Sequence, residues 1–174
     1  MSIEIAKSAR VSRLADIEPS QRGTKVIIRE DVLIDSFVKI KPVGGEGDVV
    51  IGARSAINSG CVIYSGNGVS IGESVAIAAN CTLAPVNHAY MDRDVPIAEQ
   101  GFLPSKGGIV IEDDVWIGAG CTILDGAVLR RGCVVAAGSL VRGELPEFSV
   151  NRGVPAETVG YRASSEPSEP AEER

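Results

Sequence analysis

The amino-acid sequence predicts an all-β protein in which short strands wind around a narrow prism as a parallel β-helix. Aliphatic residues recur every six positions over most of the 174-residue chain, as at Ile51, Ile57 and Ile63. A six-residue step fits neither a helical period nor alternating strands joined by hairpins, but it fits one prism side per hexad. Aromatic residues are only 4% of a chain that is 44% hydrophobic, so the interior must be built from small and aliphatic side chains.

Three hexads make one coil, and the aliphatic runs therefore predict about five or more coils between residues 28 and 146. Stacked coils pair their strands in parallel, about 4.8 Å apart. The predicted coils are residues 28–45, 51–68, 71–88, 111–128 and 129–146.

The corners of the prism have their own pattern. The position four after each aliphatic residue is small or β-branched in nearly every hexad, which suits a crowded interior corner. All four cysteines fall in this phase, which predicts that they pack as small buried side chains. Gly52, Gly72 and Gly118 are expected at corners because glycine has the backbone freedom that a sharp turn needs.

Only the two ends of such a helix expose strand edges, and both ends need a cap. Residues 1–27 are the predicted N-terminal cap, and residues 147–162 the predicted C-terminal cap segment. Residues 163–174 hold four Glu, one Arg and two Pro, and this composition predicts a disordered acidic tail.

The composition also bears on location and partners. No run of about 18 apolar residues exists, so no membrane span is expected. The first residues lack a basic segment followed by an apolar one, and the cysteines form no CxxC pair, so we expect a cytoplasmic protein. The net charge is −6 and no basic stripe is present, which argues against nucleic-acid binding. One histidine cannot by itself supply a zinc site built from three, and we expect no metal.

The period fails between Leu83 and Ile111, which predicts one long loop that protrudes from the helix at residues 89–108. This segment carries two of the few aromatic residues, Tyr90 and Phe102, and directly follows His88, the only histidine of the chain. Histidine ordinarily titrates near neutral pH and can act as a general base there. His88 is therefore the candidate catalytic residue, although it equally fits an ordinary solvated loop residue.

Several ordered motifs resemble one known family. The hexads at residues 51–56 and 117–122, the segment Asp113 to Gly120, and the segment 135–141 followed by Gly153-Val154-Pro155-Ala156 are similar to those of the hexapeptide-repeat acyltransferases. The resemblance covers residues 28–162. It implies a left-handed parallel β-helix, an exception to the right-handed crossover rule. It further implies acetyl-coenzyme A as co-substrate and a homotrimer with each active site between two subunits.

The loop narrows the resemblance to sugar O-acetyltransferases of surface-polysaccharide synthesis, with the maltose and galactoside acetyltransferases as close relatives. The pattern consists of Asn87-His88, Asp92, Asp94, Pro96-Ile97 and Gln100-Gly101. By this resemblance His88 is the base, and Asn58 and Trp116 help to shape the acceptor site, with Tyr90 and Asp92 as further candidates for substrate contact. An acidic acceptor residue of the galactoside type would fall at about Gly66, so this sequence departs from that type.

The coenzyme is expected to lie along the stacked coils, where small side chains let extended pantetheine approach. A backbone N–H near Gly118 and Ala119 is the candidate donor to the oxyanion. Lysine or arginine is common in the family at the positions of Gly143 and Glu157, so nearby arginines are expected to contact the phosphates. The predicted coenzyme-binding residues are Gly118, Ala119, Ala136, Ala137, Arg142, Arg152 and Arg162.

Three functions stay open at this point. The first is an acetyl-CoA-dependent O-acetyltransferase acting on a hydroxyl of a sugar or polysaccharide precursor. The second is an N-acetyltransferase of a nucleotide-linked amino sugar, and the third, of another class, is a non-catalytic β-helical scaffold. A γ-type carbonic anhydrase needs three histidine ligands, and the single histidine here argues against it. A serine acetyltransferase needs a large helical N-terminal domain, which this sequence does not show. A chloramphenicol-type acetyltransferase fits the loop pattern less well. Asn58 equally fits a residue that only caps a corner.

Overall fold

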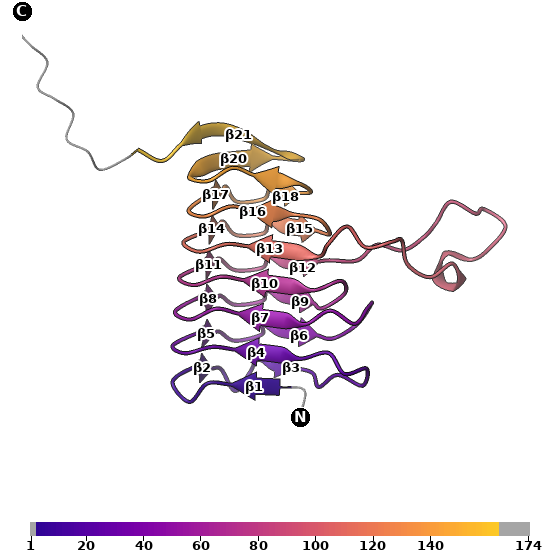
Figure 1. The fold of residues 1–174 in the computed structure, drawn as a ribbon, viewed down its shortest axis with the longest axis horizontal. Helices are drawn as coiled ribbons and strands as arrows, with labels where there is room; N and C mark the ends of the chain where they lie inside the picture. Colours follow the sequence, from indigo (N-terminus) through magenta and orange to yellow (C-terminus); the bar gives the residue numbers. More distant parts are fainter. Residues whose placement is uncertain (1–2, 164–174) are drawn as a thin grey trace, which may run out of the picture.

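The computed structural model describes residues 3–163, which form a left-handed parallel β-helix with three flat faces, as predicted (Figure 1). Each face is a sheet in which strands of successive coils lie side by side. In chain order, the first sheet contains β1 (Ile3–Ile5), β4 (Val26–Ile28), β7 (Val49–Ile51), β10 (Val69–Ile71), β13 (Ile109–Ile111), β16 (Val128–Leu129) and β19 (Glu144–Leu145). The second sheet contains β2 (Arg10–Val11), β5 (Leu33–Ile34), β8 (Ala56–Ile57), β11 (Ala76–Ile77), β14 (Trp116–Ile117), β17 (Val134–Val135), β20 (Ser149–Gly153) and β21 (Ala156–Tyr161). The third sheet contains β3 (Asp16–Ile17), β6 (Lys39–Lys41), β9 (Val62–Tyr64), β12 (Thr82–Ala84), β15 (Thr122–Leu124) and β18 (Leu140–Val141).

Three corners connect these sheets within each coil. We call the turn from the first to the second sheet the first corner, the turn from the second to the third sheet the second corner, and the turn back to the first sheet the third corner. In the coil that begins at β13, these corners are residues 112–115, 118–121 and 125–127.

The two ends of the helix are built differently. At the N-terminal end, β1, β2 and β3 pair in parallel with β4, β5 and β6, so the described part of the expected cap at residues 1–27 is a further coil. At the other end, β21 turns back and pairs with β20 in antiparallel fashion, within the segment expected to form the C-terminal cap. Apart from Ala163, the expected acidic tail lies outside the described residues.

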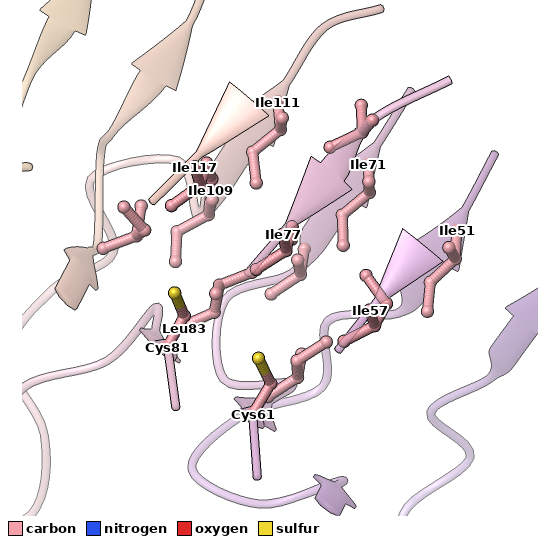
Figure 2. Close-up of a cluster of buried hydrophobic side chains, with 14 of the residues drawn as sticks. Ile51, Ile57, Cys61, Ile71, Ile77, Cys81, Leu83, Ile109, Ile111 and Ile117 are labelled. Carbon is pink, nitrogen blue, oxygen red and sulfur yellow. The ribbon is translucent and has the colours of Figure 1, made fainter. Parts of the chain in front are cut away.

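The core is a set of aliphatic ladders that run along the helix axis (Figure 2). Ile57, Ile77 and Ile117 are in register across three successive coils, and none of them is exposed to solvent. Residues at the same position of the hexad stack on one another in successive coils, so each ladder consists of one position of the repeat. The aliphatic period therefore predicted both the strands and their inward faces.

All four cysteines are free and fully buried at corners, as predicted: Cys61, Cys81, Cys121 and Cys133. The Cys61, Cys81 and Cys121 thiols donate to the carbonyls of Ala78, Gly118 and Ala136 in the coil that follows, at 3.1–3.2 Å. Burial raises the pKa of the Cys133 thiol to about 12. These thiols pack as small side chains in the core and are not positioned as nucleophiles.

The expected reason for the corner glycines is wrong. None of the three adopts a left-handed backbone; glycine is needed because the next coil approaches so closely. A Cβ on Gly52 would lie 2.4 Å from the carbonyl oxygen of Gly72, and one on Gly118 would lie 2.5 Å from the nitrogen of Ala137. The left-handed residues stand two positions later and include Arg54, Ser74 and Gly120.

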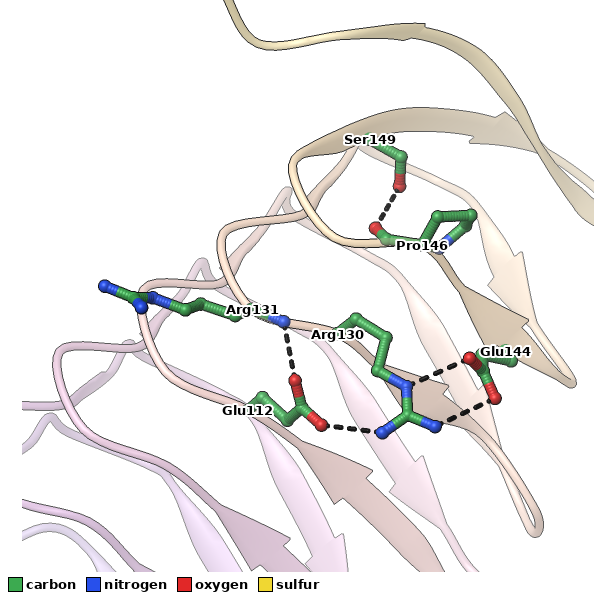
Figure 3. Close-up of polar contacts among 6 residues, drawn as sticks. All are labelled: Glu112, Arg130, Arg131, Glu144, Pro146 and Ser149. Atoms are coloured by element: carbon green, nitrogen blue, oxygen red, sulfur yellow. Dashed lines mark hydrogen bonds and ion pairs between the residues drawn. The ribbon is translucent and has the colours of Figure 1, made fainter. Parts of the chain in front are cut away.

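On the outer surface near the C-terminal end, one arginine joins three successive coils (Figure 3). The Arg130 guanidinium donates to Glu112 at 2.8 Å and to both carboxylate oxygens of Glu144 at 3.0 and 3.1 Å. Glu112 also accepts the backbone N–H of Arg131 at 2.8 Å. The Arg130 guanidinium holds the pKa of both Glu112 and Glu144 below the usual glutamate value.

Replacing Arg130 by glutamine is expected to reduce stability in a pH-dependent way. A carboxylate with a lowered pKa in the folded state stabilises the protein above the unfolded value of about 4.3, and this stabilisation is lost as the pH falls through the lowered pKa. The difference in thermal midpoint between wild type and Arg130→Gln should therefore be largest near neutral pH and shrink below about pH 4.3. The matched control is Arg93→Gln, because the Arg93 side chain is 94% exposed. A difference for Arg130→Gln that stays constant across this range would contradict the assignment.

No helix within residues 3–163 is both long and apolar enough to cross a membrane.

Candidate functional site

The chain leaves the helix at the third corner after β12 and returns to it at β13 (Figure 1). The following coil closes the same corner in only three residues, 125–127, between β15 and β16. The predicted long loop is therefore present and protrudes from the prism. Its one regular element is the short 3₁₀ helix η1 (Ile97–Glu99).

A short neck holds the two sides of the loop together, and His88 lies in this neck. His88 and Phe102 form an antiparallel β-bridge. On either side of the bridge, Ala89 N–H donates to the Gly101 carbonyl at 3.0 Å and Leu103 N–H donates to the Asn87 carbonyl at 2.8 Å. The imidazole contacts the Phe102 ring, with the two centroids 4.6 Å apart and the planes tilted by 46°.

The His88 side chain is exposed to solvent beside a hollow of about 500 Å³. Among the hydrogen bonds and ion pairs of residues 3–163, none reaches its imidazole. The ring therefore keeps its nitrogens available to a bound molecule, while Phe102 and the neck restrict where it lies. The hollow is lined by Asn87, His88, Tyr90, Ile97, Leu103 and Lys106.

The tip of the loop is organised by the Gln100 side chain. Its amide donates to the carbonyls of Asp92 and Val95, both at 2.7 Å, and its oxygen accepts the Asp92 N–H at 3.2 Å. The Asp92 carboxylate accepts the Asp94 N–H at 3.0 Å. Asp92 thus builds the tip, and its contact with substrate remains a prediction. Tyr90 is 60% exposed and lines both the His88 hollow and a second one, of about 450 Å³, at the tip.

Glycine stands at position 66, where the galactoside type would carry an acidic acceptor residue, and the structure gives a reason for it. Gly66 is left-handed, and a Cβ there would lie 2.9 Å from the Pro85 carbonyl oxygen and 3.0 Å from the Val86 side chain. Pro85 and Val86 are the first residues of the loop, so a larger residue at position 66 would displace its outgoing side.

Trp116 and Asn58 lie away from the loop. Trp116 begins β14 and points outward from the second sheet, 55% exposed, between Ala76 and Val134 of the adjacent coils. The Asn58 amide donates to the Ile77 carbonyl at 2.7 Å, so Asn58 caps the second corner. A role for either residue in acceptor binding remains a prediction.

The small residues predicted for the coenzyme lie at the second corner of two neighbouring coils. Ala119 and Ala137 are exposed, and the Gly138 N–H donates to the Ala119 carbonyl at 2.9 Å, so they form one smooth strip. The Gly118 N–H donates to the Val135 carbonyl at 2.8 Å and the Ala136 N–H donates to the Asn151 carbonyl at 2.8 Å. Gly118 is therefore not an oxyanion donor, whereas the hydrogen bonds within residues 3–163 leave the Ala119 N–H unused.

The three predicted arginines do not converge. Arg142 follows β18 at the third corner, and Arg152 lies in β20 of the second sheet; both are exposed. Arg162 donates to the Asp114 carboxylate at 2.8 Å and to the Gly132 carbonyl at 3.0 Å, so it ties the chain after β21 to the first corner. Arg142 and Arg152 are the better candidates for contact with phosphate.

Two polar residues at the base of the loop were not predicted from the sequence. Asp125 is buried and accepts hydrogen bonds from the loop as it returns, and Asn67 donates to Asp125 at 3.1 Å. Asp125-Gly126 reads as ordinary turn chemistry in the sequence, so only its position in three dimensions reveals a contact with the loop.

The predicted site residues do not come together within one chain. The hollow beside His88 is lined by loop and neck residues, and it includes neither Trp116 nor the second corner. His88 lies at the third corner, whereas the strip of Ala119 and Ala137 lies at the second. No three His, Cys, Asp or Glu side chains in the described part of the chain group closely enough to hold a metal ion.

Comparison with known proteins confirms the expected relationship. Residues 108–143 match the family described as bacterial transferase hexapeptide (six repeats). A Mycobacterium tuberculosis protein named as a probable acetyltransferase is 33% identical over 120 residues, which cover 69% of this chain and 39% of that protein. An Escherichia coli K12 protein whose name assigns it to O-acetyl transfer in lipopolysaccharide biosynthesis is 31% identical over 120 residues, covering 66% of this chain and 61% of its own length.

This chain thus spans less than two thirds of the length of either curated relative. Among solved structures, an N-acyltransferase of Bacillus cereus, AntD, superposes with a TM-score of 0.77 at 24% identity, covering 92% of this chain and 84% of that one. That likeness establishes the shared fold. The AntD chain in that structure carries one substitution and was solved in complex with dTDP-4-amino-4,6-dideoxyglucose and coenzyme A.

Proposed function

We propose that this hexapeptide-repeat protein transfers an acetyl group from acetyl-coenzyme A to a hydroxyl of a sugar or polysaccharide precursor. The observation that carries the proposal is the exposed His88 in the neck of the loop, next to a hollow of about 500 Å³. The O-acetyl transferase name of the Escherichia coli relative supports the acceptor class. A coenzyme A complex of the structurally similar N-acyltransferase supports the donor class.

In the proposed mechanism His88 acts as the general base. Its imidazole accepts the proton of the acceptor hydroxyl while the hydroxyl oxygen forms a bond to the thioester carbonyl carbon. The C–S bond then breaks, coenzyme A leaves as its thiolate, and the proton held by His88 is available to it. General-base assistance of this kind is worth about 10² to 10⁴ in rate.

The second corner is the proposed coenzyme surface. Its strip of exposed alanines and glycines lets an extended chain lie close to the backbone, and the unused Ala119 N–H can donate to the developing oxyanion. Arg152, which follows Asn151 beside this corner, is the proposed phosphate contact on the same chain, and Arg142 at the third corner is the proposed contact from a neighbouring copy. No side chain in this mechanism needs to form a covalent intermediate, in keeping with the buried thiols.

We propose a homotrimer, as the family resemblance implies, and the same geometry supports it. His88 lies at the third corner and the proposed coenzyme surface at the second, so in the proposed assembly one copy supplies the loop and a neighbour the coenzyme surface. The exposed Trp116 is a candidate contact between them. Free, buried cysteines agree with the reducing cytoplasm that we propose as the location.

The second candidate is N-acylation of a nucleotide-linked amino sugar. The superposition with AntD over 92% of this chain favours it, because the two chains share the fold on which that chemistry occurs. Both candidates use the same donor, and the acceptor distinguishes them. The third possibility, a scaffold without catalysis, predicts no coenzyme binding at all.

An acceptor screen tests the proposal. The protein is incubated with acetyl-coenzyme A and free sugars, oligosaccharides or nucleotide-linked amino sugars, and released thiol is measured alongside calorimetric binding of coenzyme A. Thiol release with a hydroxyl acceptor is the expected result. Release only with amino sugars would favour the second candidate. Absence of both coenzyme binding and turnover would favour the scaffold.

A further inference from the structure

We infer that Asp125 and Asn67 form a clamp that positions His88, although neither residue contacts the hollow. Asp125 is 5% exposed, and of the residues that the structure describes it is the only buried one with a charged side chain. A buried carboxylate is costly unless donors surround it. This inference rests on the proposed role of His88 as the base.

The donors to Asp125 come from the returning side of the loop and from the coil below it. Gly108 N–H donates to Oδ1 at 2.9 Å, and Lys106 N–H donates to Oδ2 at 2.9 Å. The Asn67 side-chain amide donates to Oδ2 at 3.1 Å. Hydrogen bonds to an ionised carboxylate are roughly twice as strong as neutral ones, so this side of the loop is firmly anchored.

Asn67 extends the clamp to the outgoing side of the loop. Its backbone N–H donates to the Pro85 carbonyl at 3.1 Å, while its side chain reaches Asp125. The two residues therefore join both sides of the loop, which are far apart in sequence at Pro85 and Lys106. Fixing both sides fixes the register in which His88 faces Phe102 in the neck.

The packing around the clamp leaves little room for the returning side of the loop to shift. A Cβ on Gly108 would lie 2.5 Å from the Gly68 carbonyl oxygen, and one on Gly126 would lie 2.8 Å from Cβ of Lys106. The Gly108 backbone thus lies directly against the Gly68 backbone, beside the point where Asp125 binds. The clamp is built into the coils, whereas the neck itself holds His88 through only a bridge and one ring contact.

Asp125→Asn is the test variant, because it keeps the size of the side chain but places an NH₂ group against N–H donors. The matched control is Asp48→Asn. Asp48 lies at the third corner between β6 and β7, and its carboxylate accepts one backbone N–H, from Lys25 of the preceding coil, at 2.7 Å, so within the described residues it faces the N-terminal end and makes no hydrogen bond to the loop.

Two readouts are needed, and the first does not depend on activity. Hydrogen–deuterium exchange of the intact protein should rise in residues 85–108 of Asp125→Asn while the coils stay protected, and it should not change there in Asp48→Asn. The second readout is steady-state kinetics with the acceptor found in the screen. Asp125→Asn should lower kcat by up to about 10²-fold, with KM for acetyl-coenzyme A unchanged.

A double-mutant cycle with His88→Ala separates positioning from general stability. If the clamp acts through His88, Asp125→Asn costs no further activity in the His88→Ala background. An equal loss in both backgrounds would overturn the inference, as would unchanged exchange in residues 85–108. If His88→Ala itself keeps the wild-type rate, the proposed base is wrong, and the exchange result still shows whether the clamp holds the loop.

Discussion

Replacing His88 by alanine is expected to lower kcat by about 10² to 10⁴-fold, the usual contribution of a general base. No second histidine exists in the chain to take over. Because the imidazole is exposed and forms no hydrogen bond within residues 3–163, its loss leaves the fold intact, and the thermal midpoint should barely change. The measurement is thiol release under saturating acetyl-coenzyme A and acceptor.

Two variants serve as controls for this prediction. His88→Asn retains a polar side chain of similar reach but cannot act as a base near neutral pH, and it should be as slow as His88→Ala. Glu99→Gln changes an exposed residue of η1 in the same loop and should keep the wild-type rate. Wild-type turnover in His88→Ala would exclude the histidine mechanism, and an equal loss in Glu99→Gln would point to general disturbance of the loop.

The second large effect is expected in the core. Ile123 lies in β15 between Leu83 and Val141 of the adjacent coils and is not exposed at all. Ile123→Ala removes contacts with both neighbours and leaves a cavity in a rigid ladder, so it should lower the free energy of unfolding by about 2–5 kcal/mol. Urea denaturation followed by circular dichroism measures this loss.

The control for Ile123 is its neighbour on the same strand. Thr122 is half-buried on the outer face of β15, and Thr122→Ala should cost much less than Ile123→Ala. Equal losses for the two variants would mean that the inward and outward phases of the hexad are assigned wrongly.

The sequence predicted the fold well because each coil repeats one local rule. Ile77 and Ile117 each follow another isoleucine by six residues, and this spacing identified both as inward-facing. They pair across neighbouring coils although the loop lies between them in the sequence. The reason given for Gly52 was wrong, since its lack of a Cβ matters for the approach of the next coil and not for a turn. Contact between coils is not a property of one hexad, so a local pattern could not reveal it.

The candidate site was predicted less completely. The loop and the singular position of His88 follow from the break in the period, and both are present in the structure. The pairing of His88 with Phe102 could not be predicted without the path of the loop, because the two residues lie on opposite sides of the loop. The corner around Gly118 and Ala119 was predicted to supply the N–H that stabilises the oxyanion. The Gly118 N–H is used in a hydrogen bond to the next coil, so of these two the Ala119 N–H is left for this role within the described residues.

By itself the sequence determined the strands, the aliphatic core, the buried cysteines and the place where the chain leaves the helix. These features depend on residues six positions apart within a coil, which the repeat relates directly. Only the tertiary structure decided which side chains hold the loop, because Asn67 and Asp125 are 58 positions apart and meet across stacked coils. Two of the three hydrogen bonds that Asp125 accepts there come from backbone N–H groups, of Lys106 and Gly108, and backbone groups carry no sequence signal.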